Sequence, residues 1–184
     1  MTESARSKLG TLGLVVMLVA AFAFVPRVFA QRSRGMMGTE APDFELPLVA
    51  NAEGLGQGHV EGSPVKLSAL RGNAVLLDFW ATWCAPCRAE APIVDQVWRR
   101  WKDRGLVVVG VNTDTADQGD PRRFALSHGL TYPIVHDLEG LASRVFGVDS
   151  LPTLVVVSRA GNVIAVRSGI TGDAELERLV KQAL

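Results

Sequence analysis

The sequence predicts an α/β fold in which helices cover both faces of a central mixed sheet. Two patterns predict it. Apolar runs typical of buried strands alternate with helical segments along most of the chain, as in sheets that contain parallel strands. The last two strand-like runs, 153–157 and 163–166, are joined by the short turn 159–162, which adds an antiparallel hairpin.

The predicted folded domain covers residues 40–184 and begins near the segment 41–44. Residues 51–62 contain four glycines and few apolar side chains, so we expect a loop there. A short strand at 65–67 follows. The run at 74–80 is almost continuously apolar and predicts a buried strand.

A long helix is expected next, ending near Arg104. Pro86 fits its first turn, where the missing N–H leaves no hydrogen bond unmade. Pro92 predicts a kink. The expected apolar face consists of Ile93, Val94, Val97, Trp98 and Trp101.

The remaining expected elements alternate in type. Asp120 is a candidate N-cap for a helix that has Pro121 at its first position. In chain order we expect a strand at 106–112, a helix at 121–128, a strand at 132–135, and helices at 138–146 and 173–184.

Residues 9–25 contain no charged side chain and predict a membrane segment. As a helix this run is about 25 Å long, enough to cross a bilayer if the next five residues reach the interface. Two basic residues precede it, as in an export signal. The predicted division is a tail (1–8), a signal-anchor or signal peptide (9–30), a linker (31–39) and the folded domain.

The segment can be interpreted as an uncleaved single-pass anchor or as a signal cleaved after Ala30, and we prefer the anchor. Arg27, Arg32 and Arg34 follow the apolar run, so the positive-inside rule alone would place the domain in the cytoplasm. The order of the segment is that of an export signal. We therefore expect the domain on the outer side of the bacterial cytoplasmic membrane, or in the periplasm if the signal is cleaved.

Cys84 and Cys87 are the only cysteines, and they fall at the predicted strand-to-helix junction. Unpaired N–H groups and the helix dipole stabilise a thiolate there, so Cys84 is the expected exposed nucleophile. Cys87, about one turn into the helix, is the expected covered thiol that resolves a mixed disulfide. Pro86 fixes the backbone between them. An incidental or zinc-binding pair is the alternative; we expect neither a metal nor a cofactor.

Two acids lie near this motif. Asp78 interrupts an apolar strand, where a buried carboxylate is unfavourable unless it is paired or protonated. It is a candidate proton acceptor for Cys87, with a raised pKa, or else a strand-end acid that faces solvent. Glu90 is three residues after Cys87 and can share its helix face, or be a solvated helix acid.

Ser150-Leu151-Pro152-Thr153 precedes a predicted strand. By propensity alone the Leu151–Pro152 bond would be trans. Trp83 could form part of an apolar platform for a partner, whereas Trp80 could equally belong to the core.

The segments 78–87 (DFWATWCAPC) and 147–153 (GVDSLPT), together with Pro92, resemble thioredoxin. More closely, the chain from about residue 38 resembles the membrane-anchored bacterial thioredoxin-like proteins of the TlpA/ResA/CcmG group. The resemblance implies a thioredoxin fold with an extra N-terminal β-hairpin. It also implies that Cys84 is nucleophilic and Cys87 resolving.

The resemblance further implies a cis bond before Pro152 and a Leu151 backbone that accepts an extended substrate peptide by strand addition. Glu90 matches an active-site acid of the ResA-like members. There are two departures: many anchored relatives carry Asn at the position of Asp78, and some carry an acidic residue at that of Ala85.

These features predict a thiol:disulfide oxidoreductase that exchanges disulfides through Cys84 and Cys87. From the resemblance we expect it to reduce disulfides of exported proteins, with cytochrome c maturation as one possible setting. The expected partners are exported dithiol or disulfide clients, a membrane thiol reductase as electron donor, and the cytoplasmic membrane through residues 9–30. The formal net charge is zero, so no basic excess suggests nucleic acid.

Two other functions stay open at this point. A thioredoxin-fold copper chaperone could use Cys84, Cys87 and His136, although related copper carriers have a longer spacing between the cysteines. A thiol peroxidase is suggested by a similar N-terminal segment in peroxiredoxins. Leu77 stands where a peroxidatic motif would have proline, and Thr82 is two rather than three residues before Cys84.

Overall fold

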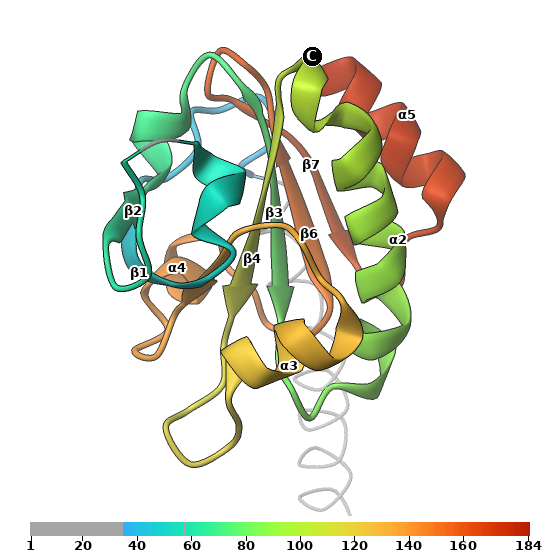
Figure 1. Ribbon diagram of the computed structural model, residues 1–184. Coiled ribbons are helices and arrows are strands. Elements are labelled where there is room, and N and C mark those ends of the chain that lie inside the picture. Colours follow the sequence, from blue (N-terminus) through green and yellow to red (C-terminus); the bar gives the residue numbers. More distant parts are fainter. Residues whose placement is uncertain (1–34, 57) are drawn as a thin grey trace, which may run out of the picture. The chain divides into compact units, whose positions relative to one another are not determined.

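The computed structural model describes residues 35–56 and 58–184 (Figure 1). The predicted tail, the predicted membrane segment and residues 31–34 of the predicted linker lie outside these ranges. Among the helices of the described part, none is both long and apolar enough to span a bilayer.

A seven-stranded mixed sheet organises the described chain, in the order β2-β1-β5-β4-β3-β6-β7. The central strands β3, β4 and β5 are parallel, while β6, β7, β1 and β2 pair antiparallel to their neighbours. The strands are β1 (Glu45–Ala50), β2 (Pro64–Lys66), β3 (Ala74–Trp80), β4 (Leu106–Asn112), β5 (Ile134–His136), β6 (Thr153–Val157) and β7 (Val163–Ser168).

Helices cover both faces of this sheet, which confirms the predicted fold class. The helices are α2 (Ala85–Trp101), α3 (Pro121–His128), α4 (Leu141–Val145) and α5 (Asp173–Ala183). Side chains of α2, α3 and α5 share one core cluster, and those of α4 share the other. In Figure 1, α2 and α5 run beside each other over the first face. The implied N-terminal hairpin is present as β1 and β2.

β3 is the strand that places the site. It is buried on both faces, and its side chains alternate between the two core clusters. Leu76 and Trp80 belong to the cluster that contains α2. Asp78 lies between them on the same face, so its carboxyl group points toward α2 rather than toward solvent.

The predicted elements are present, with small differences at their ends. The long helix is α-helical only to Trp101 and continues as a 3-10 turn to Arg104. The Asp120 cap is confirmed, because its Oδ1 accepts the amides of Arg122 and Arg123 at 2.9 and 3.1 Å.

Two predicted elements begin later than expected. The helix predicted from residue 138 begins at Leu141, because Asp137 and Gly140 close a turn first and the Asp137 carboxylate accepts the amide of Ala142. The strand predicted from Tyr132 begins at Ile134. Pro133 has no N–H to donate to a ladder, and its carbonyl accepts the amide of Gly110.

Candidate active site

The two cysteines lie where β3 passes into α2. They form a disulfide with a Cα–Cα distance of 5.3 Å. Cys84 is the N-cap of α2, and its Sγ accepts a hydrogen bond from the Cys87 amide at 3.2 Å. The Cys87 amide in the first helical turn therefore points at the sulfur that is expected to carry negative charge.

The prediction that Cys84 is exposed is wrong for this disulfide form. Cys84 and Cys87 each expose only 3% of their surface. In this form the Cys84 sulfur is bonded to Cys87 and accepts its amide hydrogen, so it is held against the start of α2. Cys87 is covered, as expected.

A buried polar network supports the segment before Cys84. The Asp114 carboxylate accepts the amide of Thr82 and the side-chain amide of Asn112. Arg88 donates to the Thr82 carbonyl at 3.0 Å from the first turns of α2. The loop is therefore held from β4 and from α2, which limits the positions that Cys84 can take.

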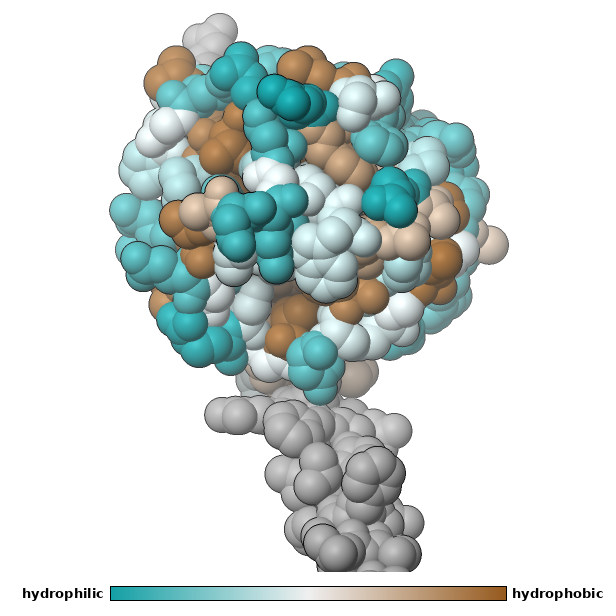
Figure 2. All heavy atoms as spheres, turned by 90° about the horizontal axis from the view of Figure 1, so that it is seen from below, coloured by the Kyte–Doolittle hydropathy of each residue, from teal (hydrophilic) through white to brown (hydrophobic). Residues whose placement is uncertain are grey.

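Trp83 is 58% exposed, next to the disulfide. Its indole N–H donates to Gln118 at 3.2 Å, which anchors the ring at the surface. Trp83 and Leu151 line one open groove of about 510 Å³, together with Leu138 and Val148. Figure 2 views this end of the molecule, where β3 and β4 finish, and shows hydrophobic and hydrophilic residues intermixed.

Leu151–Pro152 is a cis peptide bond, as the resemblance implied and against the propensity of an isolated X–Pro bond. Pro152 is buried, and its carbonyl accepts the amide of Gly169. Leu151 is half-buried beside the groove. Pro86 is exposed in the first turn of α2. The structure thus brings together Trp83 and Leu151 as walls of one groove; their binding role stays a prediction.

Asp78 is buried, with 3% of its surface exposed, and does not face solvent. The pKa of the Asp78 carboxyl is raised to about 8, chiefly by burial and also by the nearby Glu90 carboxyl, while a hydrogen bond from Tyr132 opposes the rise. The Tyr132 hydroxyl donates to Asp78 Oδ2 at 3.1 Å. The carboxyl can therefore bind and release a proton near neutral pH, as a proton acceptor for Cys87 must.

Glu90 is 1% exposed, so the alternative of a solvated helix acid is wrong. Burial raises the pKa of Glu90 to about 7, opposed by hydrogen bonds from Thr171. One oxygen accepts the Thr171 amide at 2.7 Å, and the other is buried without a hydrogen-bond partner in the described part of the chain. Two buried carboxyls with raised proton affinities therefore lie on β3 and α2, the two elements that meet at the disulfide.

Tyr132 and the Asn112–Asp114 network are site features that the sequence pattern alone did not single out. Tyr132 is the only tyrosine in the chain and was expected in a strand. Asn112 is the last residue of β4 and Asp114 lies two residues further on, at the end of a parallel strand where functional side chains often gather. That position was the available signal for the network.

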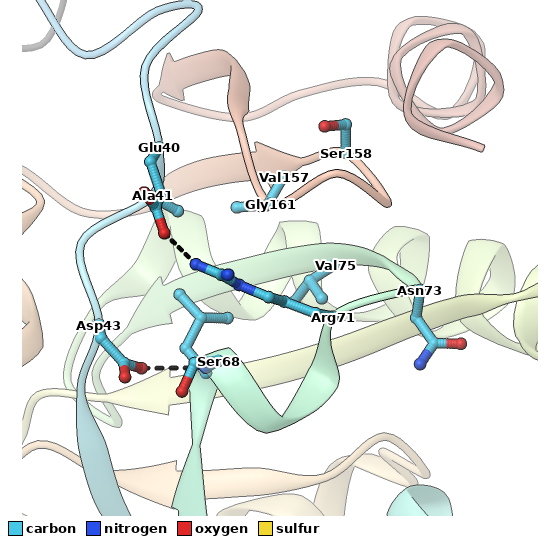
Figure 3. Close-up of a pocket in the computed structure, with 11 residues that line it drawn as sticks. Glu40, Ala41, Asp43, Ser68, Arg71, Asn73, Val75, Val157, Ser158 and Gly161 are labelled. Carbon is cyan, nitrogen blue, oxygen red and sulfur yellow. Dashed lines mark hydrogen bonds and ion pairs between the residues drawn. The ribbon is translucent and has the colours of Figure 1, made fainter.

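A second cavity, of about 380 Å³, lies away from the disulfide, at the start of β3 and the end of β6 (Figure 3). Its charged side chains already have partners. Arg71 pairs with Glu40, and Asp43 accepts the Ser68 amide at 2.9 Å. The cavity contains none of the predicted site residues.

The three residues that a copper chaperone would use, Cys84, Cys87 and His136, are not arranged as metal ligands. Cys84 and Cys87 are bonded to each other, and His136 Nε2 is hydrogen-bonded to the Asp114 carbonyl at 2.8 Å. Within residues 35–56 and 58–184, no three His, Cys, Asp or Glu side chains gather in a group that could hold a metal ion.

Comparison with known proteins identifies the family of this chain. The AhpC/TSA family matches residues 37–166, most of the chain and nearly all of its sheet. The protein belongs to the AhpC/TSA family. Within that family, curated relatives named thiol-disulfide oxidoreductase ResA match almost the whole chain. The relative from Oceanobacillus iheyensis is 31% identical over 90% of this chain and 82% of its own length. The relative from Geobacillus kaustophilus is 30% identical over 97% and 96%.

Solved structures show the same relationship. A Chlorobium tepidum protein assigned as thiol:disulfide interchange protein DsbE superposes with a TM-score of 0.67 at 34% identity. The match covers 80% of this chain and 96% of that one. This AhpC/TSA member therefore groups with the ResA/DsbE-like thiol-disulfide oxidoreductases, which are oxidoreductase enzymes.

Proposed function

We propose that the protein is a thiol:disulfide oxidoreductase that reduces disulfides of exported proteins. The observation that carries the proposal is the Cys84–Cys87 disulfide at the N-terminus of α2, with Cys84 as the helix cap and two buried acids on β3 and α2. The names and folds of the relatives support the same chemistry.

The reaction runs through one mixed disulfide. In the reduced enzyme the Cys84 thiolate attacks one sulfur of a client disulfide; a Cys84–client bond forms and the second client sulfur leaves as a thiolate. The Cys87 thiolate then attacks Cys84 Sγ, which forms the disulfide seen here and releases the first client sulfur. Two electrons pass to the client, and a thiol reductase must return them to the enzyme.

The chain's own groups assist each step. The helix N-terminus lowers the energy of the Cys84 thiolate. Cys87 is buried and must lose its proton before it attacks, and Asp78 or Glu90 can accept that proton, directly or through water. The groove beside Trp83 and Leu151 is the proposed place for the client segment that carries the disulfide.

The proposed location is the outer side of the bacterial cytoplasmic membrane, with residues 9–30 as the anchor and a membrane thiol reductase as the donor. The charge-free run in the sequence supports this assignment. Alkaline carbonate extraction of membranes from cells that express the full chain tests it. An anchored chain stays in the pellet, and full-length chain released to the supernatant would contradict the anchor.

Substitution of Cys84 tests the proposed activity. Cys84→Ser is expected to abolish reduction of insulin disulfides by the reduced protein, because serine supplies no thiolate. The unsubstituted chain is the positive control. Turnover by Cys84→Ser equal to that of the unsubstituted protein would overturn the assignment.

The direction of electron flow is tested by the reduction potential of the Cys84–Cys87 couple, measured by equilibration with glutathione. A reductant is expected to have a potential near that of thioredoxin, about −270 mV, whereas an oxidant such as DsbA lies near about −120 mV. A value close to the second figure would reverse the proposed direction.

A further inference from the structure

Tyr132 reaches Asp78 from the far side of a strand. It precedes β5, while Asp78 lies on β3, and β4 runs between these two strands. Tyr132 is fully buried, and its hydroxyl donates to Asp78 Oδ2 at 3.1 Å. A buried hydroxyl and a buried carboxyl each need a hydrogen-bond partner, and here each supplies one to the other.

Gly110 provides the space for this contact. It lies on β4 directly opposite Asp78 in the parallel ladder. A Cβ at this position would lie 2.9 Å from Tyr132 Cε2, 3.1 Å from Trp80 Nε1 and 3.3 Å from Ile134 Cγ1. Its φ is not in the left-handed region, so backbone conformation does not require glycine here. The close approach of the phenol ring is the reason that a side chain does not fit.

We propose that Tyr132, packed against Gly110, is a positioning residue for Asp78: its hydroxyl holds the carboxyl in the orientation in which it accepts the proton of Cys87. This inference rests on the proposed role of Asp78 in thiol exchange. Tyr132 does not touch the reacting sulfurs and acts only through the carboxyl.

The other groups around Asp78 act in the opposite direction or not at all. From α2, Glu90 raises the pKa of Asp78 by charge repulsion. From the neighbouring strands, Gly110 and Leu154 are the residues in register with Asp78, and neither carries a charge. The Tyr132 hydrogen bond is the interaction that lowers the pKa of Asp78. Burial holds the pKa of Tyr132 itself well above 10, so the phenol stays a donor at ordinary pH.

The test is Tyr132→Phe, which removes the hydroxyl and keeps the ring. We follow the ¹³C resonance of the Asp78 carboxyl against pH in the oxidised full-length protein. Because the charged Asp78 carboxylate loses one hydrogen bond, its titration midpoint is expected to rise by about one pH unit, which is a tenfold higher proton affinity. In the pH profile of the disulfide-reduction rate, the midpoint on the acid side is expected to move to higher pH as well.

Thr131→Val is the matched control. It removes a neighbouring hydroxyl that donates to another buried carboxylate, Asp95 Oδ1 at 2.8 Å, and so should leave the Asp78 midpoint unchanged. Gly110→Ala is a second route to the same effect, because the added methyl displaces the Tyr132 ring, and it too should raise the midpoint.

The outcomes separate this inference from the proposed function. An Asp78 midpoint unchanged in both Tyr132→Phe and Gly110→Ala overturns the positioning role, whatever the activity. An equal shift in Thr131→Val also overturns it, because the effect would then be general to this segment. Failure of the Cys84→Ser test would instead remove the proposed function and leave the Tyr132–Asp78 linkage standing.

Discussion

Asp78 makes stability depend on pH in an unusual direction for a carboxyl. Its pKa is about 8 in the folded protein against an ordinary value of 3.8. Between these values the unfolded chain has released the proton while the folded chain keeps it, so the unfolded state binds fewer protons. The free energy of unfolding therefore falls as pH rises through this window, and the raised pKa of Glu90 adds to the fall.

Asp78→Asn is accordingly expected to stabilise the fold at neutral pH, since the amide never ionises. The expected gain at pH 7 is about 4 kcal/mol, with a flatter dependence on pH above about pH 4. Urea unfolding of the oxidised protein at several pH values measures it. Asp103→Asn, at an exposed aspartate, is the control and should change little. Equal or lower stability of Asp78→Asn at pH 7 would mean that the buried carboxyl is not held neutral.

At the scale of residues, the sequence predicted part of the site. A polar residue inside an apolar strand was enough to single out Asp78, and the spacing from Cys87 was enough for Glu90. The burial of Cys84 in the disulfide form was not predictable from the local sequence pattern. Tyr132 and Gly110 were missed because their meeting with Asp78 depends on β4 lying between β3 and β5, which local pattern does not encode.

At the scale of elements, helix caps fix the segments that carry the site. Cys84 caps α2 through its sulfur, and Asp120 caps α3 through a carboxylate. α3 in turn places Phe124 against Trp80, with ring centroids 4.6 Å apart. The Asp120 cap thus supports the core contact between α3 and Trp80, the last residue of β3.

Asp120→Ala is expected to lower the free energy of unfolding by about 1 kcal/mol, because two amides at the start of α3 lose their acceptor. Thermal or urea unfolding checks it. Asp103→Ala makes the same chemical change at an exposed aspartate, which is not the N-cap of a helix, and should have little effect. If the two variants lose equal stability, the cap does not stabilise α3.

Element types were largely predictable, and their ends were not. Capping residues and apolar runs identified α3, β3 and β4 from local sequence. The late starts of α4 and β5 arise from a turn closed by Asp137 and from Pro133, which bonds across to Gly110. The first of these depends on loop geometry and the second on a partner strand, so local propensity did not show them.

At the scale of the whole molecule, the fold brings two distant segments to one end of the sheet. β3 and α2 supply the disulfide, and the segment before β6 supplies the cis-proline and one wall of the groove. The order of strands and helices predicted this sheet, and the N-terminal hairpin came from the resemblance rather than from residue pattern. Placement of residues 9–30 in a membrane stays a prediction.

The central claim is that the two sulfurs have different roles, with Cys84 as the nucleophile and Cys87 as the resolving thiol. The most direct measurement is mass spectrometry of reduced Cys87→Ser after reaction with glutathione disulfide, beside Cys84→Ser treated in the same way. The account predicts that Cys87→Ser accumulates a stable glutathione adduct on Cys84, because the resolving thiol is missing, while Cys84→Ser forms little. Equal adducts on both variants, or none on Cys87→Ser, would contradict it.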